Sequence, residues 1–148
     1  ELLKDIGNSF QALGDTDKAK DCYKKAISIN NFYAPALTNL GTLELNSGNH
    51  EKGLSLLIKA TQSDPQLVPA WINLANGFMK IGKAKEAETA CNQSIALNPN
   101  LFNSHFLLSS IFIKQNKVQE AADALKKTIE LNPKFFQAYL NIGSIFID

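Results

Sequence analysis

The chain contains no arginine, so its 15 basic residues are all lysines, against 14 acidic residues. A guanidinium fork is therefore unavailable for bidentate contacts to phosphate or guanine. A formal net charge of +1 gives no bulk field that would attract a nucleic-acid backbone. No apolar run reaches the roughly 18 residues that indicate a membrane-spanning helix. We expect neither nucleic acid nor an inserted membrane segment among the partners of this chain.

Cysteine and histidine are scarce as well. Cys22 and Cys91 are too few for a disulfide framework, and they predict reduced, buried thiols in a cytoplasmic protein. His50 and His105 have no metal-ligand spacing with the cysteines. No Ser-His-Asp arrangement or glycine-rich phosphate loop can be argued from the sequence. We interpret both histidines as packing residues and expect no catalytic residue, no metal and no cofactor.

Prolines recur at a fixed interval, because Pro65, Pro99 and Pro133 are each 34 residues apart. A period of this size indicates a repeat architecture. With position 1 of the repeat placed at Ala34, the frame predicts a single array over residues 1–148. Its repeats are 1–33, 34–67, 68–101 and 102–135, followed by a partial repeat at 136–148.

Small residues occupy three positions of this frame in every repeat. A small side chain lets two helix backbones approach where they cross, whereas a bulky one would be overpacked. Positions 4, 7, 8 and 11 have the spacing of an inward-facing helical stripe. The small residues at positions 8, 20 and 27 are Gly7, Gly41, Ala75, Ser109, Gly143, Ala19, Gly53, Ala87, Ala121, Ala26, Ala60, Ser94 and Thr128.

The helix ends are also marked in the sequence. The residues at which the first helix of each repeat must end are Gly14, Gly48, Gly82 and Asn116. Glycine and asparagine adopt the left-handed conformation of a helix C-terminus most readily. Pro35 and Pro69 fall in the first turn of the next helix, where a missing N–H costs little. The predicted unit is helix, tight turn, helix, tight turn, and the predicted fold class is all-α.

These residues resemble the tetratricopeptide repeat (TPR). The third repeat carries the family pattern in Trp71, Leu74, Ala75, Phe78, Gly82, Ala87 and Pro99. The resemblance implies a right-handed superhelical solenoid of stacked antiparallel helix pairs, with four units and the first helix of a fifth. It also implies that the first helices line a concave face and the second helices a convex one.

The second repeat departs most from the pattern. Glu44 occupies an aromatic position, Gly53 an alanine position, and Thr61 and Ser63 replace apolar residues. An interior glycine costs about 0.5–1 kcal/mol relative to alanine. We expect this repeat to be the softest of the array.

Under this resemblance, a row of polar side chains lies along the concave face. An asparagine amide both donates and accepts, so it can hold the backbone of an extended peptide. The alternative is that these asparagines are merely solvated. We hypothesise a protein segment with an apolar anchor near Phe106 and an acidic flank near Lys80 and Lys114. The candidate groove residues are Lys4, Asn8, Asn39, Thr42, Asn73, Asn76, Met79, Lys80, Phe106, Ser110, Lys114 and Asn141.

The row Asn39, Asn73 and Asn141 partly resembles the asparagine ladder in the repeat domain of O-linked N-acetylglucosamine transferases. Asp5 and Leu107 interrupt it. The function expected first is an interaction scaffold that binds an extended peptide segment. The alternative is a substrate-recruiting arm of a larger enzyme, such as a glycosyltransferase, whose catalytic domain is absent from this sequence.

A second resemblance concerns the clamp by which co-chaperones hold the C-terminal carboxylate of heat-shock chaperones. Lys4, Asn8 and Asn39 fit that clamp, but Pro69 and Asn73 stand where it needs cations. Half of the required charge is therefore missing.

The ends of the sequence predict a fragment of a longer protein. The chain begins without methionine and stops at Asp148 inside an apolar periodic run. We expect Tyr139, Ile142 and Phe146 to form an exposed apolar surface, through which the fragment self-associates because it lacks a polar cap. Oligomerisation through the repeats is a third possible function.

Overall fold

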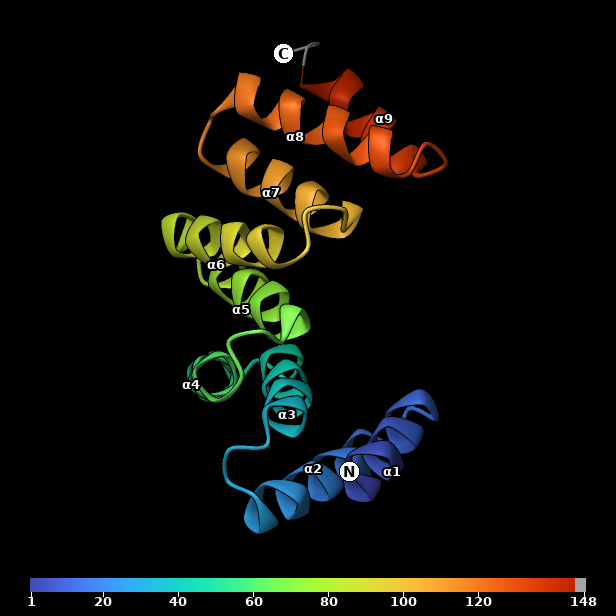
Figure 1. The fold of residues 1–148 in the computed structure, drawn as a ribbon, viewed down its shortest axis with the longest axis vertical. Helices are drawn as coiled ribbons and strands as arrows, with labels where there is room; N and C mark the ends of the chain where they lie inside the picture. The colour runs from blue at the N-terminus through green and yellow to red at the C-terminus, as the bar shows by residue number, and fades with distance from the viewer. Residues whose placement is uncertain (146–148) are drawn as a thin grey trace.

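A computed structural model describes residues 1–145, which form helices joined by tight turns and contain no strand. Figure 1 shows an elongated array with the two termini at opposite ends. The expected all-α solenoid of helix pairs is confirmed. The helices are α1 (Leu2–Ala12), α2 (Thr16–Ile29), α3 (Ala34–Asn46), α4 (His50–Ser63), α5 (Val68–Lys80), α6 (Ala84–Leu97), α7 (Phe102–Lys114), α8 (Val118–Leu131) and α9 (Phe136–Ser144).

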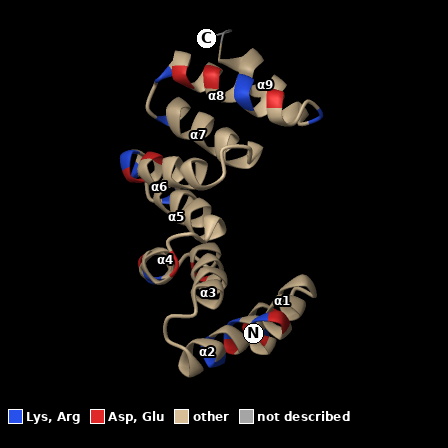
Figure 2. Cartoon of the chain, in the orientation of Figure 1, with Lys and Arg blue, Asp and Glu red and all other residues tan. Residues whose placement is uncertain are grey.

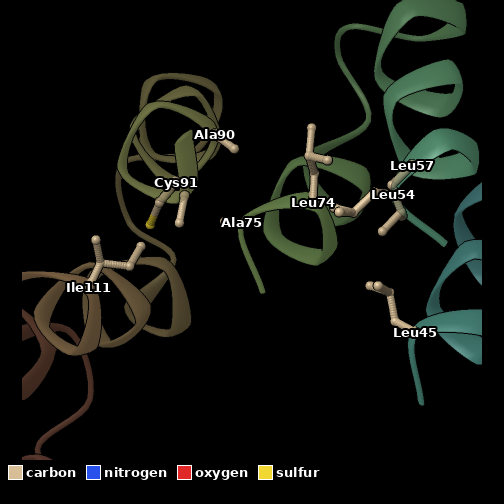
Figure 3. Packing of buried hydrophobic residues seen from close by; sticks show 9 residues of the cluster. Leu45, Leu54, Leu57, Leu74, Ala75, Ala90, Cys91 and Ile111 are labelled. Carbon is tan, nitrogen blue, oxygen red and sulfur yellow. The ribbon is translucent and has the colours of Figure 1, made fainter. Parts of the chain in front are cut away.

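Neighbouring helices pack in a regular order. The tightest contacts join α1 to α2, α3 to α4, α5 to α6 and α7 to α8, and the second helix of each pair then packs against the first helix of the next. One buried apolar cluster runs from Leu45 of α3 to Ile111 of α7, and Figure 3 shows it in the middle of the array. Contacts therefore run within each helix pair and to the adjacent repeats, as in other solenoids.

The small residues lie where the frame predicts helix crossings, because all of them except Gly143 are buried. The backbones of α3 and α4 approach closely where these two helices cross. A Cβ atom added to Gly53 would lie 2.8 Å from the Gly41 carbonyl oxygen and 2.7 Å from Leu45 Cγ. At Gly143, an added Cβ would meet none of the described atoms within 4 Å.

The turns within the repeats share one geometry. The residue predicted to end the first helix has a positive φ of 79° at Gly14, 84° at Gly48, 76° at Gly82 and 59° at Asn116. The following residue then donates its N–H to a carbonyl one turn back, as from Lys83 to Phe78 at 2.9 Å. This is the Schellman arrangement, which satisfies the last carbonyls of a helix.

A hydrogen bond from position 4 to the proline carbonyl closes the start of each of the last three first helices. This hydrogen bond fixes the turn between repeats. Leu37, at position 4 of the second repeat, has no polar atom in its side chain and cannot form the bond. The atom pairs are Trp71 Nε1 and Pro65 O at 2.9 Å, His105 Nε2 and Pro99 O at 2.8 Å, and Tyr139 Oη and Pro133 O at 3.2 Å.

In the second repeat, a buried carboxylate paired with an exposed lysine takes the place of the missing aromatic ring. Glu44 is 2% exposed, and its carboxylate accepts hydrogen bonds from Lys52 Nζ at 2.8 Å and Asn49 Nδ2 at 2.7 Å. Lys20 of α2 reaches the same carboxylate at 3.5 Å, so the pair also links two repeats. The hydrogen bond from Lys52 is the main reason that the pKa of Glu44 falls from 4.5 to about 2.

This repeat is therefore not simply degenerate. Gly53 is required by the close approach of α3 and α4, and Thr61 and Ser63 donate their hydroxyls to carbonyls of their own helix. The lower stability of the repeat stays a prediction.

One expected core residue is wrong. Position 7 of the inward-facing stripe falls on Ile6 in the first repeat, but Ile6 is 38% exposed, because no described helix precedes α1. Phe146, expected at an apolar end surface, lies outside the described residues. The exposed apolar side chains of α9 are Phe136, Tyr139 and Leu140, while Ile142 is half-buried.

Candidate functional site: the concave groove

The first helices of the middle repeats carry few charges. Each of α3, α5 and α7 contains a single charged residue, namely Glu44, Lys80 and Lys114 respectively. Figure 2 shows the charges gathered mainly on the second helices instead. The surface formed by the first helices is therefore suited to neutral polar and apolar contacts rather than to a highly charged ligand.

A first hollow lies between α3 and α5 and has a volume of about 400 Å³. Sequence reasoning assigned Thr42, Asn73, Asn76, Met79 and Lys80 to the groove, and all of them line this hollow. Leu45 and Asn46 complete it and were not among the candidates.

A second hollow of about 460 Å³ lies between α5 and α7. It shares Asn76 and Met79 with the first, so the two hollows adjoin. The candidates Phe106 and Ser110 line it, together with Ile72, Leu107 and the unanticipated Asn103. Phe106 also packs within the protein, because its ring meets the ring of Phe135 edge-on with the ring centres 4.9 Å apart.

The polar groups in these hollows differ in their availability. Thr42 and Ser110 donate their hydroxyls to carbonyls of their own helices, and Lys80 donates to Asn46 Oδ1 at 2.9 Å. Within residues 1–145, the side-chain amides of Asn73 and Asn76 make no hydrogen bond to protein. Both amides therefore remain able to donate to and accept from a ligand backbone.

The N-terminal candidates form a separate cluster. Asn39 Nδ2 donates to Asn8 Oδ1 at 2.8 Å, and the hydroxyl of buried Tyr23 donates to the same oxygen at 2.8 Å. Lys4 pairs with Asp5 at 2.7 Å, a hydrogen bond that raises the pKa of Lys4. These three candidates are thus already engaged with the protein.

The C-terminal candidates lie outside both hollows. Lys114 is exposed near the end of the concave row, and Asn141 of α9 is half-buried and accepts from Gln137 Nε2 at 3.1 Å. The sequence predicted an interrupted row along the whole array, and the two hollows gather only its central members around α5.

Sequence reasoning missed a larger hollow of about 810 Å³ on the outer side of α4. His50 lines it and is exposed, so its interpretation as a packing residue is wrong. The sequence feature that could have predicted this hollow is the apolar character of Phe32, Leu54 and Ile58. At the equivalent positions, the other second helices and inter-repeat turns carry mostly polar residues.

Cys22 and Cys91 are free thiols; Cys91 is fully buried, Cys22 half-buried. Burial raises the pKa of Cys91 to about 12, which keeps it protonated near neutral pH. Within residues 1–145, no three His, Cys, Asp or Glu side chains are grouped to hold a metal ion. None of the described helices is long and apolar enough to cross a membrane.

Comparison of this chain with models of known protein families identifies the family to which it belongs. Models described as tetratricopeptide repeat match residues 1–33, 34–67, 68–101 and 106–148. The chain belongs to the tetratricopeptide repeat family. A relative of this TPR array, Tetratricopeptide repeat protein 8 of Mus musculus, is 31% identical over 67 residues, which cover 45% of the array and 13% of the mouse protein. The array thus spans a small part of that relative.

Solved structures have the same fold as this TPR array. MamA is 26% identical with a TM-score of 0.86, and the match covers 95% of the array and 82% of MamA. The first TPR of Spaghetti (RPAP3), bound to the HSP90 peptide SRMEEVD, is 23% identical with a TM-score of 0.73. That match covers 76% of the array and 89% of the RPAP3 domain.

Proposed function

We propose that this TPR array is an interaction scaffold that binds an extended segment of another protein in its concave groove and performs no catalysis itself. The observation that carries the proposal is the pair of unengaged amides, Asn73 and Asn76, beside two adjoining hollows. An extended peptide needs partners for its own N–H and C=O groups, and these amides can supply both.

The energies are consistent with a reversible interaction. A net hydrogen bond contributes about 0.5–1.5 kcal/mol. Two amides and an apolar side chain buried beside Met79 and Phe106 would together support micromolar affinity, about −8 kcal/mol. Lys80 at the rim favours an acidic residue next to that apolar anchor, and Lys114 extends the positive end.

The RPAP3 domain supports segment binding as a use of this fold, because it holds a peptide with two consecutive glutamates. We do not extend its ligand to this array. Pro69 and Asn73 stand where a carboxylate clamp needs cations, and Lys4 is paired with Asp5. The segment proposed here is held along its backbone rather than by its C-terminal carboxylate.

Site-specific photo-crosslinking in cells tests the proposal and identifies the partner. A crosslinking residue in place of Met79 would sit on the floor of both hollows, and one in place of exposed Asn92 on α6 serves as the control. We expect one protein to be captured from Met79 and not from Asn92. Equal capture from both positions contradicts the proposal.

A second candidate function is a substrate-recruiting arm of a larger enzyme, such as a glycosyltransferase. The row Asn39, Asn73 and Asn141 supports it, although only Asn73 is unengaged. A transferase assay on the protein as it is expressed in cells discriminates between the two functions.

We further propose that the array is a single unit whose repeats end at residues 33, 67, 101 and 135. We also propose that it acts in the cytoplasm, where its free thiols stay reduced. Finally, we propose that it self-associates through α9. Phe136, Tyr139 and Leu140 are 70%, 47% and 59% exposed on this helix. Light scattering at increasing concentration tests the association, which Leu140→Gln should weaken.

A further inference from the structure

The outer side of α4 carries a second, larger apolar hollow. Leu54 and Ile58 form part of its floor, Phe32 reaches it from the turn before α3, and Ile81 reaches it from the turn after α5. Phe32 is 66% exposed, Ile58 39% and Ile81 36%. Exposed apolar groups that converge on one surface indicate an interaction site.

The repeat itself provides the comparison that makes this surface unusual. The residues equivalent to Ile58 are Lys24, Asn92 and Lys126, and those equivalent to Phe32 are Gln66, Asn100 and Lys134. The residues equivalent to Leu54 are Lys20, Glu88 and Ala122. The fold thus tolerates polar residues at the exposed positions, so its stability does not require Phe32 and Ile58 to be apolar.

We propose that this hollow docks an amphipathic helix of a partner protein, with acidic residues flanking its apolar face. The proposal is independent of the concave groove, which lies on the first helices. A helix satisfies its own backbone and needs only side-chain packing from its receptor. The hollow is mostly apolar around Leu54 and Ile58, and among the described residues Gln62 is the one side-chain amide that lines it. The 14 residues of α4 extend about 20 Å, enough to support three to four turns of a docked helix.

The charges around the hollow favour an acidic partner. Lys59 and Lys83 line it, against Glu51 as the acidic residue. Lys59 Nζ lies 5.3 Å from the centre of the Phe32 ring and donates a hydrogen bond to Asn31 Oδ1, but it contacts no carboxylate within residues 1–145. Lys83 approaches Glu86 only at 3.9 Å. Both ammonium groups can therefore pair with carboxylates beside the apolar face of a docked helix.

The test uses a synthetic 15-residue helical peptide with leucines on one face and glutamates on the others, and a matched peptide with lysines in place of the glutamates. We expect the glutamate peptide to bind and the lysine peptide to bind at least tenfold more weakly at low salt. Equal binding of both peptides would overturn the proposal.

Substitutions drawn from the equivalent repeat positions keep the fold intact. Phe32→Gln with Ile58→Asn should weaken binding of the glutamate peptide at least tenfold, and Lys59→Gln with Lys83→Asn should weaken it severalfold. Val118→Thr, which changes a 48% exposed apolar residue of α8 into the residue of the equivalent position in α2, should leave binding unchanged.

Two further results would overturn the proposal. One is binding that Phe32→Gln with Ile58→Asn leaves unchanged, while circular dichroism shows a folded array. The other is a dimer of the array that this pair dissociates, because the hollow would then be occupied by a second copy. Asn73→Ala with Asn76→Ala, in the concave groove, should not change binding of the glutamate peptide. The proposal for the outer hollow and the proposal for the concave groove can therefore be refuted separately.

Discussion

Asn39 Nδ2 donates a hydrogen bond of 2.8 Å to Asn8 Oδ1, and this bond joins the first helices of two successive repeats. The Tyr23 hydroxyl donates to the same oxygen at 2.8 Å, from a ring that is fully buried between α1 and α3. Asn73 is equivalent to Asn39 in the next repeat, yet its amide makes no such bond. The same residue at the same position thus has a structural role in one repeat and is available to a ligand in the next.

This difference predicts that replacing the two asparagines by alanine has unequal effects on the stability of the array. Asn39→Ala should lower the free energy of unfolding by about 1 kcal/mol, because it removes an inter-repeat hydrogen bond. Asn73→Ala should change it by less than about 0.5 kcal/mol. Urea unfolding of the two variants measures both values, and equal losses would contradict the assignment.

The Glu44–Lys52 pair predicts an acid-sensitive array. The pKa of Glu44 is lowered from 4.5 to about 2, so its contribution is complete above the ordinary pKa and is lost as the pH falls toward 2. This shift corresponds to about 3 kcal/mol. Between pH 6 and pH 2, the wild type should lose about this much more stability than Glu44→Gln. Thermal unfolding across this range checks the difference, and parallel pH profiles would refute it.

The crossing of α3 and α4 predicts opposite effects of one substitution at two helical glycines. Gly53→Ala should lower stability by about 1–3 kcal/mol, because its Cβ would lie 2.8 Å from the Gly41 carbonyl oxygen. Gly143→Ala, at a site with nothing within 4 Å, should raise stability by about 0.5 kcal/mol. Denaturant midpoints of both variants test the pair; a stabilising Gly53→Ala would mean that the helices do not approach this closely.

The ring at position 4 predicts which replacements of His105 are tolerated. His105→Tyr should keep the hydrogen bond to the Pro99 carbonyl, because Tyr139 makes the equivalent bond to Pro133. His105→Leu should lose it and cost about 1 kcal/mol, leaving the carbonyl to water. Melting temperatures of the two variants provide the comparison, and a more stable leucine variant would show that packing outweighs the bond.

The sequence was sufficient to predict the backbone of this fold. Glycine or asparagine at the helix ends and small residues at the crossings are local requirements, and Asn116 has the predicted left-handed φ of 59°. The predictions of helix ends and helix crossings succeeded because they depend on spacing within a helix pair and not on the identity of distant neighbours. Asn76 and Met79, which the same frame assigns to the groove, line both hollows beside α5, and their role in binding stays a prediction.

Side-chain partnerships between repeats could not be predicted in the same way. The bond between Asn8 and Asn39, and the contact of Lys20 with Glu44, depend on the rotation between neighbouring helix pairs. The hollow on the outer side of α4 was not predicted from the sequence for a related reason. Phe32 and Ile58 are 26 residues apart in the sequence, and only the packing of α4 brings them to one surface.

The most direct test of the central claim is a calorimetric titration of the array with the partner segment recovered by crosslinking at Met79. Asn73→Ala with Asn76→Ala should weaken binding about tenfold or more, while the matched variant Asn92→Ala, on the convex helix α6, keeps the wild-type affinity. Unchanged affinity for the double variant, with the array still folded, would contradict the concave groove as the binding site.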